Sequence, residues 1–218
     1  IINSGFSRAT TRSNLTFELW PGARLLSKTN FSRSVYNSVA SSTSSADTKQ
    51  QGIIKQALGM DPAMPATKDF DPDLEGIIDT DGTLRNPYIE ATEPTLTTTT
   101  NRITSGLTLD LQLAKHLTFR PTASVDYTVS RADSYYPSTT QQGKSTAGND
   151  MGFASIQYVE SMKWANENQL TYSNVFNRKH SFTATAVMSL EKLIRAKDRS
   201  TARGFVTDDL LNNVLQNG

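Results

Sequence analysis

Residues 102–130 read RITSGLTLDLQLAKHLTFRPTASVDYTVS, and this stretch decides the fold because apolar and polar side chains alternate along it with a period of two. The apolar residues at odd positions are Ile103, Leu107, Leu109, Leu111, Leu113, Leu117, Phe119, Ala123, Val125, Tyr127 and Val129. Polar residues fill most even positions, and Ala114, Lys115 and His116 form a short turn between the two arms. The pattern predicts an antiparallel hairpin with one apolar face and one polar face.

The arms of this hairpin have the length of membrane strands. A strand in a soluble protein has about five or six residues, whereas a strand that crosses a bilayer needs about ten. We therefore expect a set of apolar residues to face lipid, while Thr108 and Thr122 face the interior of a barrel. The lipid-facing set is Leu107, Leu109, Leu111, Phe119, Val125, Phe182, Ala186 and Leu190.

The same alternation recurs on both sides of the central hairpin. Hairpins are predicted at about 12–38, 99–130 and 163–194, with long connections at about 39–98 and 131–160 and a last segment at 196–218. The outer hairpins turn at Pro21-Gly22 and at 177–179. Short helices are expected at 52–60 and after Thr207, a plausible N-cap. Consecutive up-and-down strands would place the long connections at one rim and the short turns at the other.

Composition narrows the possible functions. Only 36% of the 218 residues are hydrophobic and no apolar run reaches the roughly 18 residues that a membrane helix needs, so any membrane role falls to strands. A net charge of +1 without a basic block disfavours nucleic-acid binding. Zero cysteines exclude disulfides and thiolate metal sites. The chain begins at Ile1 without an initiator Met, and we expect it to be a piece of a longer protein without a plug domain.

A soluble all-β sandwich is the competing interpretation of the hairpins. Its strands also alternate, and a second sheet rather than lipid covers their apolar faces. Long connections disfavour a compact soluble domain and are expected in an outer-membrane barrel. Pro121 is awkward in either case, because it cannot donate a ladder hydrogen bond.

Several segments carry a resemblance to one family. Residues 164–172, WANENQLTY, followed by Phe176 and Lys179-His180-Ser181, resemble the W-x-N-E-N-x-L-x-Y…F…K-H pattern of SusC/RagA-type TonB-dependent outer-membrane transporters. Three further parts of the chain resemble the same family: HLTFR (116–120), leading through Asp126-Tyr127 to YYPST (135–139); Asp81-Gly82, followed by Asn86-Pro87; and the opening IINSGFSR (1–8).

This resemblance implies a fold class and a role. The chain would be an antiparallel up-and-down meander, a segment of a transmembrane β-barrel of about 22 strands with long extracellular loops that contain short helices. Such transporters import glycans or peptides across the outer membrane of Gram-negative bacteria, under a surface lipoprotein lid of SusD type. TonB would act only through an N-terminal region that this chain lacks, and outer-membrane lipid would surround the wall.

The candidate ligand-binding residues are Tyr135, Tyr136, Tyr88 and Asp81, which lie where strands give way to loops. Aromatic faces stack on sugars or peptides while hydroxyl groups orient them. For the tyrosine pair this interpretation competes evenly with an interfacial aromatic girdle. For Trp164 the girdle is favoured.

No metal, cofactor or enzymatic chemistry is predicted. The acidic stretch 69–81 invites a calcium site, but Leu74 and Thr80 stand where an EF-hand needs Gly and Glu, so a solvated loop is favoured. No nucleophile motif, phosphate loop or paired carboxylates suggest catalysis. The sequence therefore predicts part of an outer-membrane nutrient importer, with a soluble carbohydrate-binding or adhesion module as the alternative.

Overall fold

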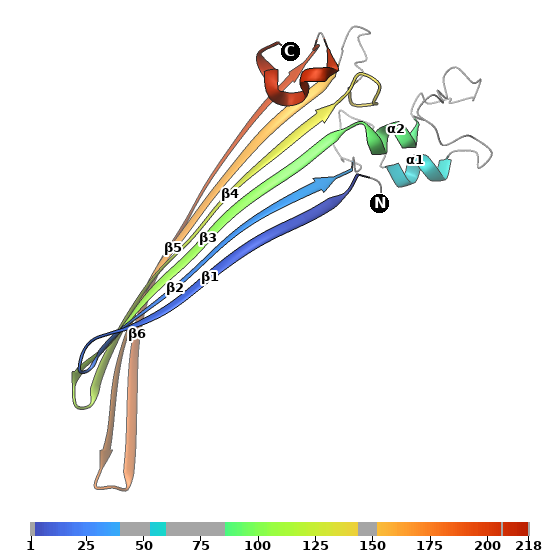
Figure 1. Ribbon diagram of the computed structural model, residues 1–218. Helices are drawn as coiled ribbons and strands as arrows, with labels where there is room; N and C mark the ends of the chain where they lie inside the picture. The colour runs from blue at the N-terminus through green and yellow to red at the C-terminus, as the bar shows by residue number, and fades with distance from the viewer. Residues whose placement is uncertain (1–2, 40–52, 60–85, 144–151, 206, 218) are drawn as a thin grey trace.

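A computed structural model describes residues 3–39, 53–59, 86–143, 152–205 and 207–217, and they form a single six-stranded sheet (Figure 1). The strands are β1 (Gly5–Trp20), β2 (Ala23–Ser38), β3 (Thr95–Ala114), β4 (Leu117–Tyr136), β5 (Phe153–Phe176) and β6 (His180–Arg203). Each strand pairs antiparallel with the next in the order β1 to β6, and the sheet does not close on itself within this chain. The predicted up-and-down meander is confirmed.

The strands extend further than the predicted hairpins. The central hairpin runs from Thr95 to Tyr136 rather than 99–130, and the last runs over 153–203 rather than 163–194. The first starts at Gly5 rather than at about residue 12, and the connection expected at 131–160 shrinks to 137–152. The reason is that residues in the extensions, such as 130–134 opposite 155–159, pair through their backbones while both faces are largely polar. Period-two patterning reveals a strand only where one face is apolar.

Short turns and helices lie at opposite ends of the sheet (Figure 1). The three hairpin turns gather at one end, and at the last of them Asn177 and Arg178 have φ values of 51° and 54°, which suit a tight hairpin turn. At the other end lie α1 (Ile53–Gly59), α2 (Pro87–Thr92) and the 3-10 helix η1 (Asp208–Asn217). The helices predicted at 52–60 and after Thr207 are both present, although the second is of the 3-10 type rather than α.

Local signals explain two of these helices. In α2, Pro87 stands at the first position and the Asn86 side chain accepts a hydrogen bond from the Tyr88 amide at 2.9 Å. This is the N-cap and N1 arrangement that sequence reasoning should have recognised. At η1 the Thr207 hydroxyl accepts from the Asp209 amide at 3.2 Å, as its predicted role as a cap requires.

The pairing register separates the two faces of the sheet. Residues directly opposite in antiparallel strands project to the same side. Pairs such as Leu107–Ala123, Val125–Trp164 and Asn166–Leu190 therefore place all eight predicted lipid-facing residues on one face. Thr108 pairs with Thr122 on the other face, and their hydroxyls lie 3.2 Å apart. The predicted assignment of side chains to two faces is confirmed.

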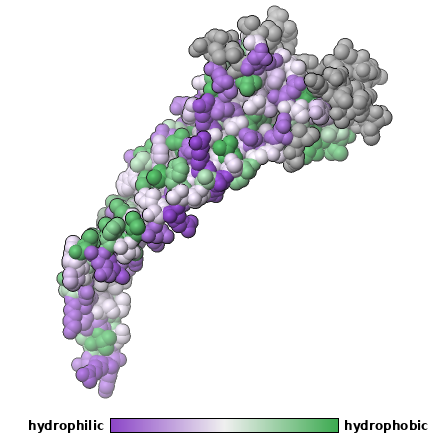
Figure 2. Space-filling model, viewed as in Figure 1, coloured by the Kyte–Doolittle hydropathy of each residue, from purple (hydrophilic) through white to green (hydrophobic). Residues whose placement is uncertain are grey.

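The apolar side chains form a band across one face of the sheet rather than a buried core. From Ile103 to Leu113 a strand advances about 33 Å, which at a tilt of about 40° spans roughly the 25 Å height of a barrel's apolar belt. Large side chains in this band stay open, as at Phe17 (47% exposed), Leu107 (48%) and Met188 (58%). Figure 2 shows hydrophobic and hydrophilic groups both reaching the surface along the strands. No described residue of this chain buries the band.

Pro121 produces the expected local defect. Residues of β3 and β4 pair continuously up to Thr108–Thr122 and pair again at Leu111–Phe119, whereas the two residues between these pairs on each strand do not pair. On its other side Pro121 lies opposite Asn168 of β5. The missing donor thus interrupts the β3–β4 ladder without ending the strand.

Candidate functional site

The polar face carries a ladder of charged groups on neighbouring strands. Asp110 of β3 forms ion pairs with Arg120 of β4, at 2.9 Å, and with Arg24 of β2, at 3.5 Å. Further along the same two strands and on the same face, Arg102 Nε donates to Asp126 at 2.9 Å. Exposed pairs of this kind contribute at most about 1 kcal/mol each to stability. Their effect here is to neutralise the carboxylates of Asp110 and Asp126.

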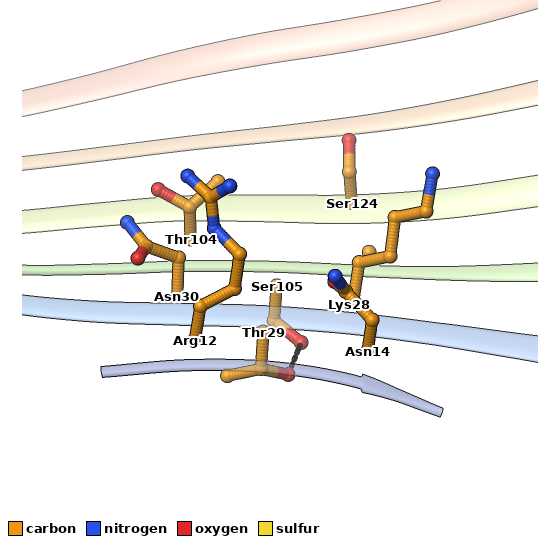
Figure 3. Close-up of a pocket in the computed structure, with 9 residues that line it drawn as sticks. Arg12, Asn14, Lys28, Thr29, Asn30, Thr104, Ser105 and Ser124 are labelled. Carbon is orange, nitrogen blue, oxygen red and sulfur yellow. Dashed lines mark hydrogen bonds between the residues drawn. The ribbon is translucent and has the colours of Figure 1, made fainter. Parts of the chain in front are cut away.

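A shallow hollow opens on this polar face beside the charged ladder (Figure 3). It has a volume of about 400 Å³ and lies where Lys28, Gly106 and Ser124 face one another across three strands. Gly106 has no side chain, so the floor of the hollow is backbone. Arg12, Asn14, Lys28 and Asn30 rise around it and point the same way in the close-up.

The groups around the hollow suit a polar ligand. Arg12 and Lys28 supply positive charge, Asn14 supplies an amide, and Ser124 supplies a hydroxyl. The Asn30 Oδ1 atom is buried and has no hydrogen-bond partner among the described residues. Such a set can donate to carboxylate or carbonyl oxygens and can accept from hydroxyl or amide groups. The hollow therefore presents both hydrogen-bond donors and acceptors on the polar face.

The loop end of the sheet contains the most buried part of the described chain. Tyr135 is fully buried and packs edge-on against Phe205, with ring centroids 5.7 Å apart. Its hydroxyl donates to Asp208 Oδ1 at 2.5 Å, and the Ser138 hydroxyl donates to the second oxygen of that carboxylate at 2.9 Å. Burial, and then the hydrogen bond to Asp208, raise the pKa of Tyr135. These contacts fasten η1 to the ends of β4 and β5.

A second cluster adjoins the first. Tyr136 packs against Phe153 at a centroid distance of 6.1 Å, and Ile53 of α1 and Leu96 of β3 pack against this pair. Burial is the main cause that raises the pKa of Tyr136. Tyr135 and Tyr136, adjacent in β4, thus pack against η1 and α1, respectively, and connect these helices to the strand ends.

The structure places the predicted ligand-binding residues in different settings. Tyr135 and Tyr136 lie in the two buried clusters, where their rings contact protein rather than solvent. Tyr88 is 37% exposed on α2 and keeps a free surface. Asp81, like the acidic stretch 69–81, lies outside the described residues. Both tyrosine rings pack against other parts of the chain, and this structural role is an alternative to the predicted ligand contact.

Sequence reasoning missed the charged polar face. Its groups come from strands that are far apart in the chain, as Arg12, Lys28 and Ser124 are, and only the register brings them into one place. In the described part of the chain no group of three His, Asp or Glu side chains is arranged to hold a metal ion.

None of the described helices has the length and apolarity needed to span a membrane.

Comparisons with known proteins give a likeness in fold. No protein-family model matches this chain, and no curated protein matches its sequence. It is similar to a chain of a solved structure of the RagAB peptide importer in the "closed-closed" state, with a TM-score of 0.70 and 16% identity over 99% of this chain. A structure of the RagAB peptide transporter matches with a TM-score of 0.70 and 15% identity. This chain spans 23% of the length of each matched chain. The sheet thus has the fold of a segment of a β-barrel transporter.

Proposed function

We propose that this chain forms part of the wall and extracellular mouth of an outer-membrane nutrient importer of the TonB-dependent SusC/RagA type. Its cargo would be a glycan or a peptide, and outer-membrane lipid would cover the apolar band. A surface lipoprotein of SusD type would meet the loop end. TonB would act through another region of the protein. The role is transport, not catalysis.

One observation carries the proposal: a single sheet presents an uncovered apolar band on one side and a charged, hydroxyl-rich surface on the other. Leu107 and Thr108 are neighbours in β3 and belong to opposite faces, as do Leu190 and Glu191 in β6. A wall between hydrocarbon and an aqueous lumen requires this division. The loop clusters also fit, because they gather all described helices at the rim opposite the short turns (Figure 1).

The fold likeness supports the same class. The solved structures that the chain matches are described as a peptide importer and a peptide transporter, and the match covers 99% of this chain. A soluble carbohydrate-binding or adhesion module is the competing class. It requires a second sheet to cover the band, and such a cover would bury the side chains of Leu107 and Met188.

Cysteine labelling on intact cells that carry the complete protein tests the proposal. Leu58→Cys in α1, where the native side chain is 82% exposed, should react with a membrane-impermeant maleimide. Lys179→Cys, in the turn between β5 and β6, should react only after the cells are broken. The two variants are matched, because both substitutions fall at exposed sites outside the strands.

The outcomes separate the two classes. Labelling of the loop site alone supports the proposed topology and an outer-membrane location. The reverse pattern would overturn the orientation, and recovery of the protein in the soluble fraction would favour the soluble module. Loss of growth on one glycan or peptide source, after deletion of the gene, would then identify the cargo.

A further inference from the structure

Cations without carboxylate partners gather on the polar face. Arg24, Arg102, Arg120 and Lys163 each pair with an acidic side chain. Among the described residues seven other cations of this face have no such partner: Arg8, Arg12, Lys28, Arg195, Lys197, Arg199 and Arg203. Arg203 instead donates to the Gln142 carbonyl at 3.0 Å and lies over the Phe153 ring. The chain as a whole has a net charge of only +1, so this positive surface arises from the fold rather than from composition.

Three cations of β6 stand at alternate positions of the strand. Arg195, Lys197 and Arg199 lie opposite Ser161, Val159 and Gln157 of β5, respectively, so they project to the same side of the sheet. Alternate residues of a strand are about 6.7 Å apart. Arg199 is further oriented by its Nε, which donates to the Ser155 hydroxyl at 3.1 Å. We call these three residues the β6 cation row.

The residues of β5 and β4 that lie beside the β6 cation row have neutral side chains. Ser161, Val159 and Gln157 of β5 lie opposite Thr128, Ser130 and Ala132 of β4 on the same face. The row therefore faces no acid across β5 and β4. A charged surface of one sign raises the local concentration of ions of the opposite sign.

The other face of the same strands differs in charge. There Asp198 lies opposite Tyr158, and Glu160 lies opposite Ala196. Arg131 lies nearby but is paired with Asp133 at 2.8 Å. Positive charge is therefore concentrated on the polar side of the sheet, above the apolar band, where the proposed function places the aqueous mouth.

We propose that the β6 cation row binds acidic peptides in extended conformation. In an extended peptide alternate side chains lie on one side at about the spacing of the row, so carboxylates at every second position meet successive cations. Arg holds carboxylates through paired donors, while Lys acts as a point charge. The inference deepens the proposed function, on which it rests, by naming the class of cargo.

Binding of fluorescent peptides to the purified complete protein tests this inference. A peptide of alternating Glu and Ser should bind more tightly than the Gln and Ser peptide of equal length, and added salt should reduce the difference. The triple variant R195Q/K197Q/R199Q should bind the Glu peptide about tenfold more weakly, because each exposed ion pair contributes a fraction of a kilocalorie. Its affinity for the Gln peptide should not change.

Matched single variants control for general charge loss. Lys197→Gln on the polar face should weaken binding of the Glu peptide, whereas Lys192→Gln, on the same strand and the opposite face, should not. Equal binding of the two peptides, or an unaffected triple variant, would overturn the inference. Preference for a polyuronate oligosaccharide over the Glu peptide would also overturn it.

Failure of the inference differs from failure of the proposed function. Uptake of neutral peptides or glycans without any preference for acid would leave the importer intact and remove the β6 cation row as a binding site. Selective binding of the Glu peptide by a protein that supports no uptake in cells would support the row and overturn the role in import.

Discussion

Arginine placed at Leu107 should destabilise the complete protein far more than arginine at the neighbouring Thr108. The apolar band runs from Ile103 to Leu113, so both positions lie close to its middle, and the register puts them on opposite faces. On the lipid side a mid-depth Arg costs about 2 to 4 kcal/mol. At Thr108 the change removes a hydroxyl contact with Thr122, which contributes about 0.5 to 1.5 kcal/mol. The expected gap is about 0.5 to 3.5 kcal/mol, with a central value of about 2 kcal/mol.

Urea titration of the protein folded into lipid vesicles measures this gap, with the folded fraction followed by gel mobility before and after heating. Leu113→Arg, at the edge of the band, provides the depth control and should cost about 0 to 1 kcal/mol. Equal penalties at Leu107 and Thr108 would refute the assignment of faces. A penalty at Leu113 as large as that at Leu107 would refute lipid as the cover, because packing against a second sheet has no such dependence on depth.

Three further predictions concern the loop end and the isolated chain. Gly152→Ala should make η1 accessible to proteolysis, because the added Cβ would lie 2.7 Å from the Tyr135 hydroxyl and the backbone φ of +80° is unfavourable for Ala. Gly204→Ala is the control: its φ is +86° but no atom lies within 4 Å of the added Cβ, so this variant should show only backbone strain of about 1 kcal/mol. The raised pKa of Tyr135 predicts that its stabilising contribution is complete below about pH 10 and is lost as pH rises through the folded-state value. Alkaline absorbance titration should therefore show late-titrating phenols, among them Tyr135 and Tyr136, and Tyr135→Phe should remove one of them. The 218 residues expressed alone should aggregate in water, since the outer edges of β1 and β6 are unpaired, and sharp amide resonances from a monomer would contradict this.

The sequence contained enough information to predict the hairpins and the faces of the sheet, because both depend on local order. Alternation identifies which side chains share a face, and the turns at Pro21-Gly22 and 177–179 set which strands pair. Strand ends such as Tyr136 and Phe153 were not predictable in this way. They lie beyond the apolar band, where both faces are largely polar and no period remains.

The candidate site was less predictable, since its contacts are distant in the chain. Tyr135 and Tyr136 were rightly identified as an aromatic pair at a strand end, but their neighbours Phe205 and Phe153 follow many residues later. Nothing in the local sequence distinguishes a ring that stacks on a ligand from one that anchors a loop. Asn86-Pro87, by contrast, was a local signal for α2 that went unused.

The positive surface shows why net charge is a poor guide to this kind of protein. A strand displays every second residue on each face, so Arg195, Lys197 and Arg199 are separated in sequence by Ala196 and Asp198, which belong to the other side. Read linearly, the segment is a mixture of charges with no basic block. When the two faces are considered separately, one face has three cations opposite neutral residues of β5, and Asp198 projects to the other face. Since a barrel wall divides two environments, its charge has meaning only one face at a time, and selectivity for an anionic cargo can arise in a chain that is nearly neutral overall.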